Sequence, residues 1–135
     1  ILPGFVFGPP LSCDFDGASA QLMKRIIGGD LEGLPEYLSI ADVRDVASLH
    51  VKSIKCEKSN GKRLIVTAPL SVHISFISKI LNDNGISVSG YKDLLQNIES
   101  GGYSADISEV ISLFDWKPIQ LEKTILDMAK FIQKN

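Results

Sequence analysis

The chain opens on a continuous apolar run, residues 1–7, in which apolar and polar positions do not alternate. Strands buried on both faces, as in parallel sheets covered by helices, have this uninterrupted pattern. The Gly-Pro-Pro that follows ends the run, because proline lacks an amide donor and restricts the residue before it. Residues 63–68 form a second run, rich in strand-forming residues and closed by Pro69. Both runs are predicted to be buried parallel strands.

Segments with apolar residues at every third or fourth position are expected to be amphipathic helices. Turn signals such as Gly-Gly, Ser-Asn-Gly and Asn-Asp-Asn-Gly separate them. Short strands are expected at residues 37–41 and 86–91. Helices are expected at residues 18–27, from 42 to just before 59, around 74–81, near 94–98, at 107–114 and around 121–132.

The second of these helices has clear local signals. Asp42 is its expected N-cap, with Asp45 three residues later, and Asp106 is expected to cap the helix at 107–114. On the second helix His50 is interpreted as a core residue, and His73, further along the chain, as a residue at the surface or beside a cap. The stripe expected to face the core consists of Val46, Ala47, His50, Val51 and Ile54.

Strands that alternate with helices predict an α/β protein, although 135 residues hold too few strands for a complete doubly wound domain. The chain is 44% hydrophobic and 22% charged, as in ordinary globular proteins. Its formal net charge of -2 argues against nucleic acid as a partner. No apolar run approaches the roughly 20 residues that cross a bilayer, so a cytoplasmic protein with no membrane partner is expected.

The cysteines and histidines do not have the spacing of a metal site. Cys13 and Cys56 fit neither a disulfide scaffold nor a pair of metal ligands, and the two isolated histidines do not complete a zinc site. Both cysteines are therefore expected to be reduced, and no metal is predicted.

Four segments, in order, resemble the second half of the extended short-chain dehydrogenases/reductases. They are Leu-Pro-Gly-Phe-Val-Phe-Gly-Pro at residues 2–9, Asp-Val-Arg-Asp-Val-Ala at 42–47 with His50, Gly-Lys-Arg-Leu-Ile-Val at 61–66, and the block from Asp106 to Trp116 with Pro118. The hexapeptide at 42–47 is the most specific, and it resembles the dihydroflavonol-reductase and aldehyde/ketone-reductase branch. An aspartate, Asp115, stands where the family's last block has glycine.

The resemblance implies the C-terminal part of a Rossmann-type fold: its last sheet strands and a small, helical, substrate-binding lobe over residues 1–135. The cofactor-binding and catalytic motifs of the family are not in this sequence. Tyr37, Tyr91 and Tyr103 have no lysine four positions later, and the glycine-rich stretch at 28–33 follows a helix and not a strand. We therefore expect no catalytic residue in this chain, and an N-terminal dinucleotide-binding half outside it.

The resemblance also implies where a nicotinamide cofactor lies. Pro3, Gly4, Phe5 and Val6 correspond to the segment whose backbone binds the nicotinamide carboxamide, and Gly4 is expected to let that backbone approach closely. Ser19 corresponds to a position near the cofactor at a helix start. The alternatives are an ordinary buried strand and a helix-capping serine. The expected cofactor is NADP or NAD, with NADP preferred because this branch reduces carbonyl compounds.

A substrate pocket is predicted from Phe7, Met23, Ile40 and Arg44. The three apolar residues are equally interpretable as core, and Arg44, placed between two aspartates, as a local salt bridge. The expected activity of the parent enzyme is hydride transfer from the nicotinamide to a small carbonyl compound. Two alternatives remain open: an NDP-sugar epimerase or dehydratase of the same superfamily, and a non-catalytic binding module derived from it.

The apolar first run also gives an expectation about partners. The sequence has no initiator Met and begins inside this run, so we expect partner strands to come from a missing N-terminal half. An orphan strand would otherwise associate with a second copy through its free edge.

Overall fold

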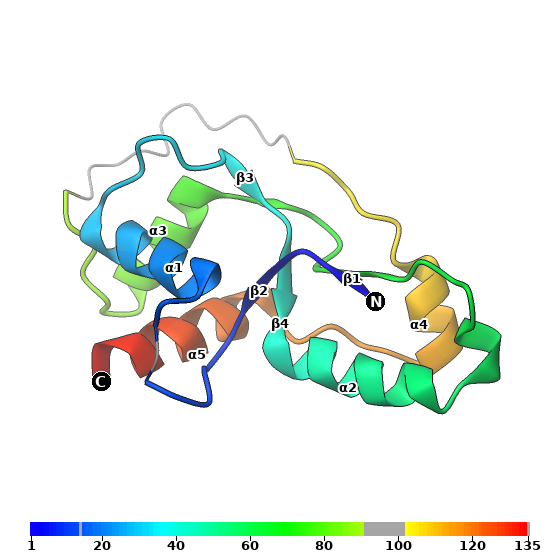
Figure 1. Cartoon of the computed structure of the whole chain (residues 1–135). Coiled ribbons are helices and arrows are strands. Elements are labelled where there is room, and N and C mark those ends of the chain that lie inside the picture. The colour runs from blue at the N-terminus through cyan, green and yellow to red at the C-terminus, as the bar shows by residue number, and fades with distance from the viewer. Residues whose placement is uncertain (14, 91–101, 135) are drawn as a thin grey trace.

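The structure is a computed structural model that describes residues 1–13, 15–90 and 102–134 (Figure 1). Short strands alternate with helices along the chain, which confirms the α/β class. The elements are β1 (Leu2–Pro3), β2 (Phe5–Phe7), α1 (Ala18–Gly28), β3 (Tyr37–Leu38), β4 (Ile40–Asp42), α2 (Val43–Ile54), the 3-10 helix η1 (Glu57–Ser59), β5 (Ile65–Val66), β6 (Val72–His73), α3 (Ile74–Asp83), α4 (Ser108–Phe114) and α5 (Leu121–Lys134).

The first apolar run is divided between two parallel pairings. β1 pairs with β5, placing Leu2 opposite Ile65, and β2 pairs with β4, placing Phe5 opposite Ile40. The predicted parallel pairing is confirmed. One edge of each of these strands is thus paired with a strand of the chain itself, and the expectation that further partner strands come from outside the chain stays a prediction. β3 and β6 form a third, antiparallel pair.

The prediction that the two runs are buried holds only in part. Phe7 and Val66 are fully buried, but Leu2 and Phe5 are each 38% exposed and Ile65 is 41% exposed. Leu2 and Ile65 are opposite each other in the β1–β5 register. One face of this strand pair is therefore not covered by the described residues.

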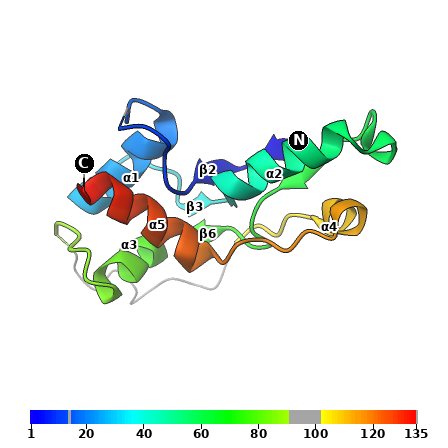
Figure 2. The ribbon, with the colours of Figure 1, turned by 90° about the horizontal axis from the view of Figure 1, so that it is seen from below.

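Two hydrophobic clusters form the core. Figure 2 shows α1, α3 and α5 gathered at one end of the molecule and α2 and α4 at the other. The first cluster includes Met23, Ile26, Leu38, Ile77, Leu81, Ile125 and Met128. The second includes Ala41, Leu49, Leu64, Val66, Val110 and Trp116. The helix α5 packs in the first cluster and also contacts β2 and β4, so it links the helical end to the strands.

The helix α2 faces the core with a different side from the one predicted. Its buried residues are Asp45 and Leu49, while Val51 is 55% and Ile54 86% exposed. Leu49 is buried in the second cluster, with Leu64 and Val66 of the β5 region. The predicted stripe of α2 was therefore wrong except for the partly buried Val46. His50 is exposed and its Nδ1 lies 2.8 Å from the Val46 carbonyl oxygen, so it is not a core histidine.

The predicted caps agree better with the structure. Asp42 is the N-cap of α2 and accepts a hydrogen bond of 2.8 Å from the Arg44 amide. Asp106 accepts one of 3.0 Å from the Ser108 amide, at the first residue of α4. Asp115 ends α4 in the left-handed region, with φ 47, a conformation that glycine adopts without strain. His73 is the N-cap of α3. The sequence had placed it at the surface or beside a cap, which is close to this position.

Two expectations concern the segment after α3. No strand forms at residues 86–90; instead Ile86 and Val88 are buried and the Ser89 amide donates to the Ile27 carbonyl at 3.0 Å. Residue 91 and the helix expected near 94–98 lie outside the described residues.

The structure gives three further facts about the described part of the chain. Within it no helix has the length and apolar character needed to span a membrane. No group of three His, Cys, Asp or Glu side chains there could hold a metal ion. Cys13 is exposed, Cys56 is half-buried, and neither is in a disulfide.

Candidate functional site

An open hollow brings together all five residues that the resemblance assigned to the cofactor. The backbone of the β1–β2 segment, the start of α1 and the β3–β4 segment enclose it. Its lining residues are Pro3, Gly4, Phe5, Val6, Ser19, Tyr37 and Ser39. Residues far apart in sequence thus share one surface, while their contact with a cofactor stays a prediction.

Gly4 has a structural role in this hollow that the sequence did not indicate. A Cβ at Gly4 would lie 2.1 Å from the Ser39 carbonyl oxygen, which no side chain tolerates. The same oxygen accepts a 2.7 Å hydrogen bond from the Phe5 amide, and the Gly4 amide donates to the Val66 carbonyl at 3.2 Å. Glycine is therefore required between β1 and β2, where the pairing partner of the first run changes from β5 to β4.

Ser19 is the second residue of α1 and is half-buried. The N-cap is Gly17, which makes no side-chain cap bond, so the alternative that Ser19 caps the helix is wrong. The first amides of a helix have no intrahelical partner and carry a partial positive charge. The hydroxyl of Ser19 therefore lines the hollow beside a helix start suited to an anionic or hydroxyl group.

Tyr37 and Ser39 line the hollow, and sequence reasoning assigned neither of them to a binding site. The Tyr37 ring meets the His73 ring edge-on at 5.1 Å between centroids and the Tyr103 ring at 6.3 Å. The intervening Leu38 is fully buried on the opposite side. The alternation of Tyr37 and Ser39 with apolar residues was a signal in the sequence that could have identified this strand face.

Three of the four residues predicted for a substrate pocket lie in the core. Phe7 and Met23 are 0% exposed and Ile40 is 2% exposed, and all three belong to the first hydrophobic cluster. They do not line the hollow. Their positions agree with the alternative interpretation, in which these apolar residues belong to the core.

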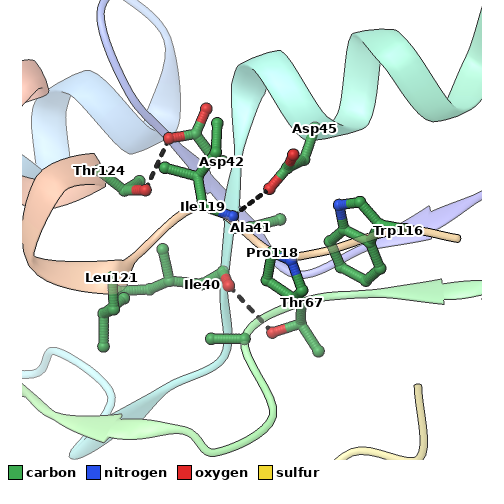
Figure 3. Close-up of a pocket in the computed structure, with 11 residues that line it drawn as sticks. Ile40, Ala41, Asp42, Asp45, Thr67, Trp116, Pro118, Ile119, Leu121 and Thr124 are labelled. Atoms are coloured by element: carbon green, nitrogen blue, oxygen red, sulfur yellow. Dashed lines mark hydrogen bonds between the residues drawn. The ribbon is translucent and has the colours of Figure 1, made fainter. Parts of the chain in front are cut away.

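Arg44 is held by carboxylates of the chain itself. Its Nε and Nη2 donate to the two oxygens of Asp42 at 2.8 and 2.6 Å, and its Nη1 donates to Asp127 at 2.7 Å. The predicted salt bridge therefore exists, but with Asp127 in place of the neighbouring Asp45. Asp45 accepts a 2.9 Å hydrogen bond from the Ile119 amide instead (Figure 3). Arg44 does not line the hollow.

The protonation states of this network follow from its contacts. Burial raises the pKa of Asp42, but hydrogen bonds from Arg44 and Thr124 lower it by more, so it lies below the ordinary value. Burial also raises the pKa of Asp127, and hydrogen bonds from Lys123 and Arg44 again outweigh it. The hydrogen bond with Asp42 raises the pKa of Arg44. All of these groups are charged at neutral pH.

Comparison with curated proteins gives one partial relative. A putative uncharacterized oxidoreductase of Schizosaccharomyces pombe is 39% identical over 70 residues, which are 48% of this chain and 21% of that protein. No protein-family profile matches the chain.

Solved structures match nearly the whole chain. The yeast methylglyoxal/isovaleraldehyde reductase in complex with NADPH is 26% identical, with a TM-score of 0.76 over 98% of this chain and 42% of its own. Vestitone reductase from alfalfa is 17% identical, with a TM-score of 0.73 over 97% of this chain and 42% of its own. The UDP-glucuronic acid 4-epimerase of Bacillus cereus, in complex with NAD, is 18% identical, with a TM-score of 0.65 over 98% of this chain and 44% of its own. The chain thus spans less than half the length of these solved proteins.

Proposed function

The chain has the fold of the C-terminal part of the extended short-chain dehydrogenases/reductases, and we propose that it is the substrate-side part of an NAD(P)-dependent carbonyl reductase. The observation that carries the proposal is the hollow, because the residues that the family resemblance assigns to the cofactor line it together. The partial relative, an oxidoreductase, supports the same class of reaction.

The hollow has suitable chemistry for the nicotinamide end of the cofactor. Backbone carbonyl groups of the β1–β2 segment offer acceptors for a carboxamide, and the Ser19 hydroxyl lies at the start of α1. None of the seven lining residues is acidic, so nothing in the lining repels a phosphate. When bound, the cofactor supplies the hydride. The residues that line the hollow position the nicotinamide end of the cofactor and exclude water from the side of the ring that they cover.

The substrate is proposed to be a small aldehyde or ketone that lies against Tyr37 and Ser39 of the same hollow. Tyr37 offers an aromatic face and a hydroxyl, and its ring is supported edge-on by His73. The general acid and its lysine belong to the family's Tyr-x-x-x-Lys pair, which is not among the 135 residues. NADP is the preferred cofactor, since the yeast reductase is complexed with NADPH.

The second candidate function is that of an NDP-sugar epimerase, and the likeness to the Bacillus cereus epimerase supports it. A nucleotide diphosphate is usually bound by lysine or arginine. None of the residues that line the hollow is basic. We therefore favour the reductase over the epimerase, and a cytoplasmic location stays a prediction.

The proposed partner of the chain is a Rossmann-type dinucleotide-binding half. Two uncovered apolar surfaces support this: the face of the β1–β5 pair with Leu2 and Ile65, and the outer side of α2 with Val51 and Ile54. Parallel strands are normally covered on both faces. Self-association through the first strand is the alternative, and a non-catalytic binding module would use the same surfaces.

The test uses the complete protein that the gene encodes. We expect it to oxidise NADPH in the presence of aldehydes or ketones. Ser19→Tyr, which fills the hollow, should raise the KM for NADPH about tenfold, equivalent to about 1.4 kcal/mol of binding. Ser48→Tyr, on the exposed surface of α2, is the control and should leave the KM unchanged. Absence of turnover with every carbonyl tried, or an unchanged KM in Ser19→Tyr, would contradict the proposal.

A further inference from the structure

Trp116 has a buried donor without an acceptor. The residue is 6% exposed, and its indole Nε1 is the one buried side-chain polar atom without a hydrogen-bond partner in the described part of the chain. Buried donors in folded proteins are nearly always bonded to the protein or to an ordered water, because an unpaired one costs free energy. The missing acceptor therefore needs a physical explanation.

A small, partly open cavity adjoins the indole. Trp116, Asp45, Thr67 and Ile119 are among its lining residues (Figure 3). The space open to the centre of a water molecule is about 10 Å³, which is close to the minimum that holds one ordered water. The cavity is too small for a cofactor, a substrate or any larger ligand.

The cavity also has acceptors for such a water. One carboxylate oxygen of Asp45, Oδ2, accepts from the Ile119 amide at 2.9 Å, and Oδ1 has no hydrogen bond to any residue that the structure describes. Asp45 is 9% exposed. Thr67 Oγ1 donates to the Ile40 carbonyl at 3.1 Å and keeps lone pairs of its own. Figure 3 shows the indole nitrogen of Trp116 turned toward the side on which Asp45 lies.

We infer that one structural water occupies this cavity, accepts a hydrogen bond from Trp116 Nε1–H and donates to the Asp45 carboxylate. Buried waters typically make about three hydrogen bonds, and Thr67 Oγ1 offers the third partner. The water would join the corner after α4 to the first turn of α2.

The test is a high-resolution crystal structure of the full-length protein. We expect density for a water at about 2.7–3.2 Å from Trp116 Nε1 and from an Asp45 oxygen. An empty cavity, or a direct bond between Nε1 and Asp45, would overturn the inference. In Trp116→Phe, which removes the donor, the occupancy of the water should fall at least twofold; an unchanged occupancy would show that Trp116 does not hold it.

A solution measurement decides the question if the variant does not fold. The indole N–H resonance of Trp116 in the wild-type protein should show magnetisation transfer from a long-lived bound water. Absence of this transfer, with the indole proton protected from exchange, would mean that the cavity is dry and the inference wrong.

Discussion

The hydroxyl of Thr124 on α5 donates a hydrogen bond of 2.6 Å to the carboxylate of Asp42, the N-cap of α2. Arg44 binds both oxygens of the same carboxylate and reaches Asp127, also on α5. Because α5 packs in the first hydrophobic cluster and α2 in the second, this network ties the two clusters together.

Replacing Arg44 with lysine tests the geometry of this network at constant charge. Lysine cannot form the paired bonds of Arg44 Nε and Nη2 to Asp42, nor reach Asp127 at the same time. The Arg44 side chain is 37% exposed, so we expect a moderate loss of about 1–2 kcal/mol in the free energy of unfolding. Urea denaturation measures this loss.

Arg25→Lys is the matched control. Arg25 pairs with Asp30 at 2.7 Å on the surface, where the two side chains are 38% and 59% exposed. Solvent weakens exposed pairs, so this substitution should change stability less than Arg44→Lys. Equal effects of the two substitutions would mean that the Asp42–Asp127 network has no special role.

The pH dependence of stability should report the ionisation of Asp42. Its pKa is lowered in the folded state, so its contribution is present above the unfolded value of about 3.9 and is lost as the pH falls through the folded value. The difference in unfolding free energy between wild type and Asp42→Asn should therefore be largest at neutral pH and shrink in acid. Thr124→Val removes one hydrogen bond that lowers this pKa, so it should move the loss to higher pH. Urea titrations at several pH values test both expectations, and a difference that does not vary with pH would contradict them.

Gly4→Ala should disturb both the fold and the hollow. The added Cβ would lie 2.1 Å from the Ser39 carbonyl oxygen, a backbone atom that cannot move without breaking its bond with the Phe5 amide. We expect a loss of about 3 kcal/mol, at the upper end of overpacking effects. Gly28→Ala is the control, because a Cβ there meets nothing within 4 Å and alanine favours the helix. It should be neutral or stabilising. Thermal unfolding of the two variants gives the comparison, and similar melting temperatures would refute the expectation.

The sequence was a good guide where local signals decide the structure. The helices α1 and α5 each have one apolar face, and the Asp42 cap acts within a single turn. The parallel pairing of the first strands was also predictable, because an uninterrupted apolar run indicates a parallel strand. The helix faces and the cap depend on neighbouring residues and not on the rest of the fold.

The sequence was a poor guide where partners distant in the chain decide. The helix α2 has two candidate inner faces, and the chain buries the one with Asp45 because the Ile119 amide, far along the chain, satisfies its carboxylate. Periodicity favoured the outer face with Val51 and Ile54. Similarly, Tyr37 reaches the hollow only because β4 pairs with β2, and a pattern within one segment does not report such pairing.

The 135-residue chain alone should reduce no carbonyl compound. It has no Tyr-x-x-x-Lys pair and no glycine-rich turn after a strand, so it lacks both the proton donor and the pyrophosphate site that the proposed reaction needs. A spectrophotometric assay of NADPH oxidation with the purified chain tests this. Turnover above the level of a buffer control would refute it.

The outer face of α2 gives the last prediction, which concerns the proposed partner. Ile54 is 86% exposed in this structure, so an aspartate there should cost little if the face stays in water. If the dinucleotide-binding half covers the face, Ile54→Asp in the full-length protein should lower the free energy of unfolding by about 1.5–3 kcal/mol, the value of burying such a side chain. Ser48→Asp, at another exposed position of α2, should have little effect. Sedimentation separates the two kinds of partner: a dimer that dissociates in Ile54→Asp would assign the face to a second copy, and a monomer that is destabilised would assign it to the other half of the same chain. Equal and small effects of the two substitutions would leave α2 without a partner and contradict the prediction.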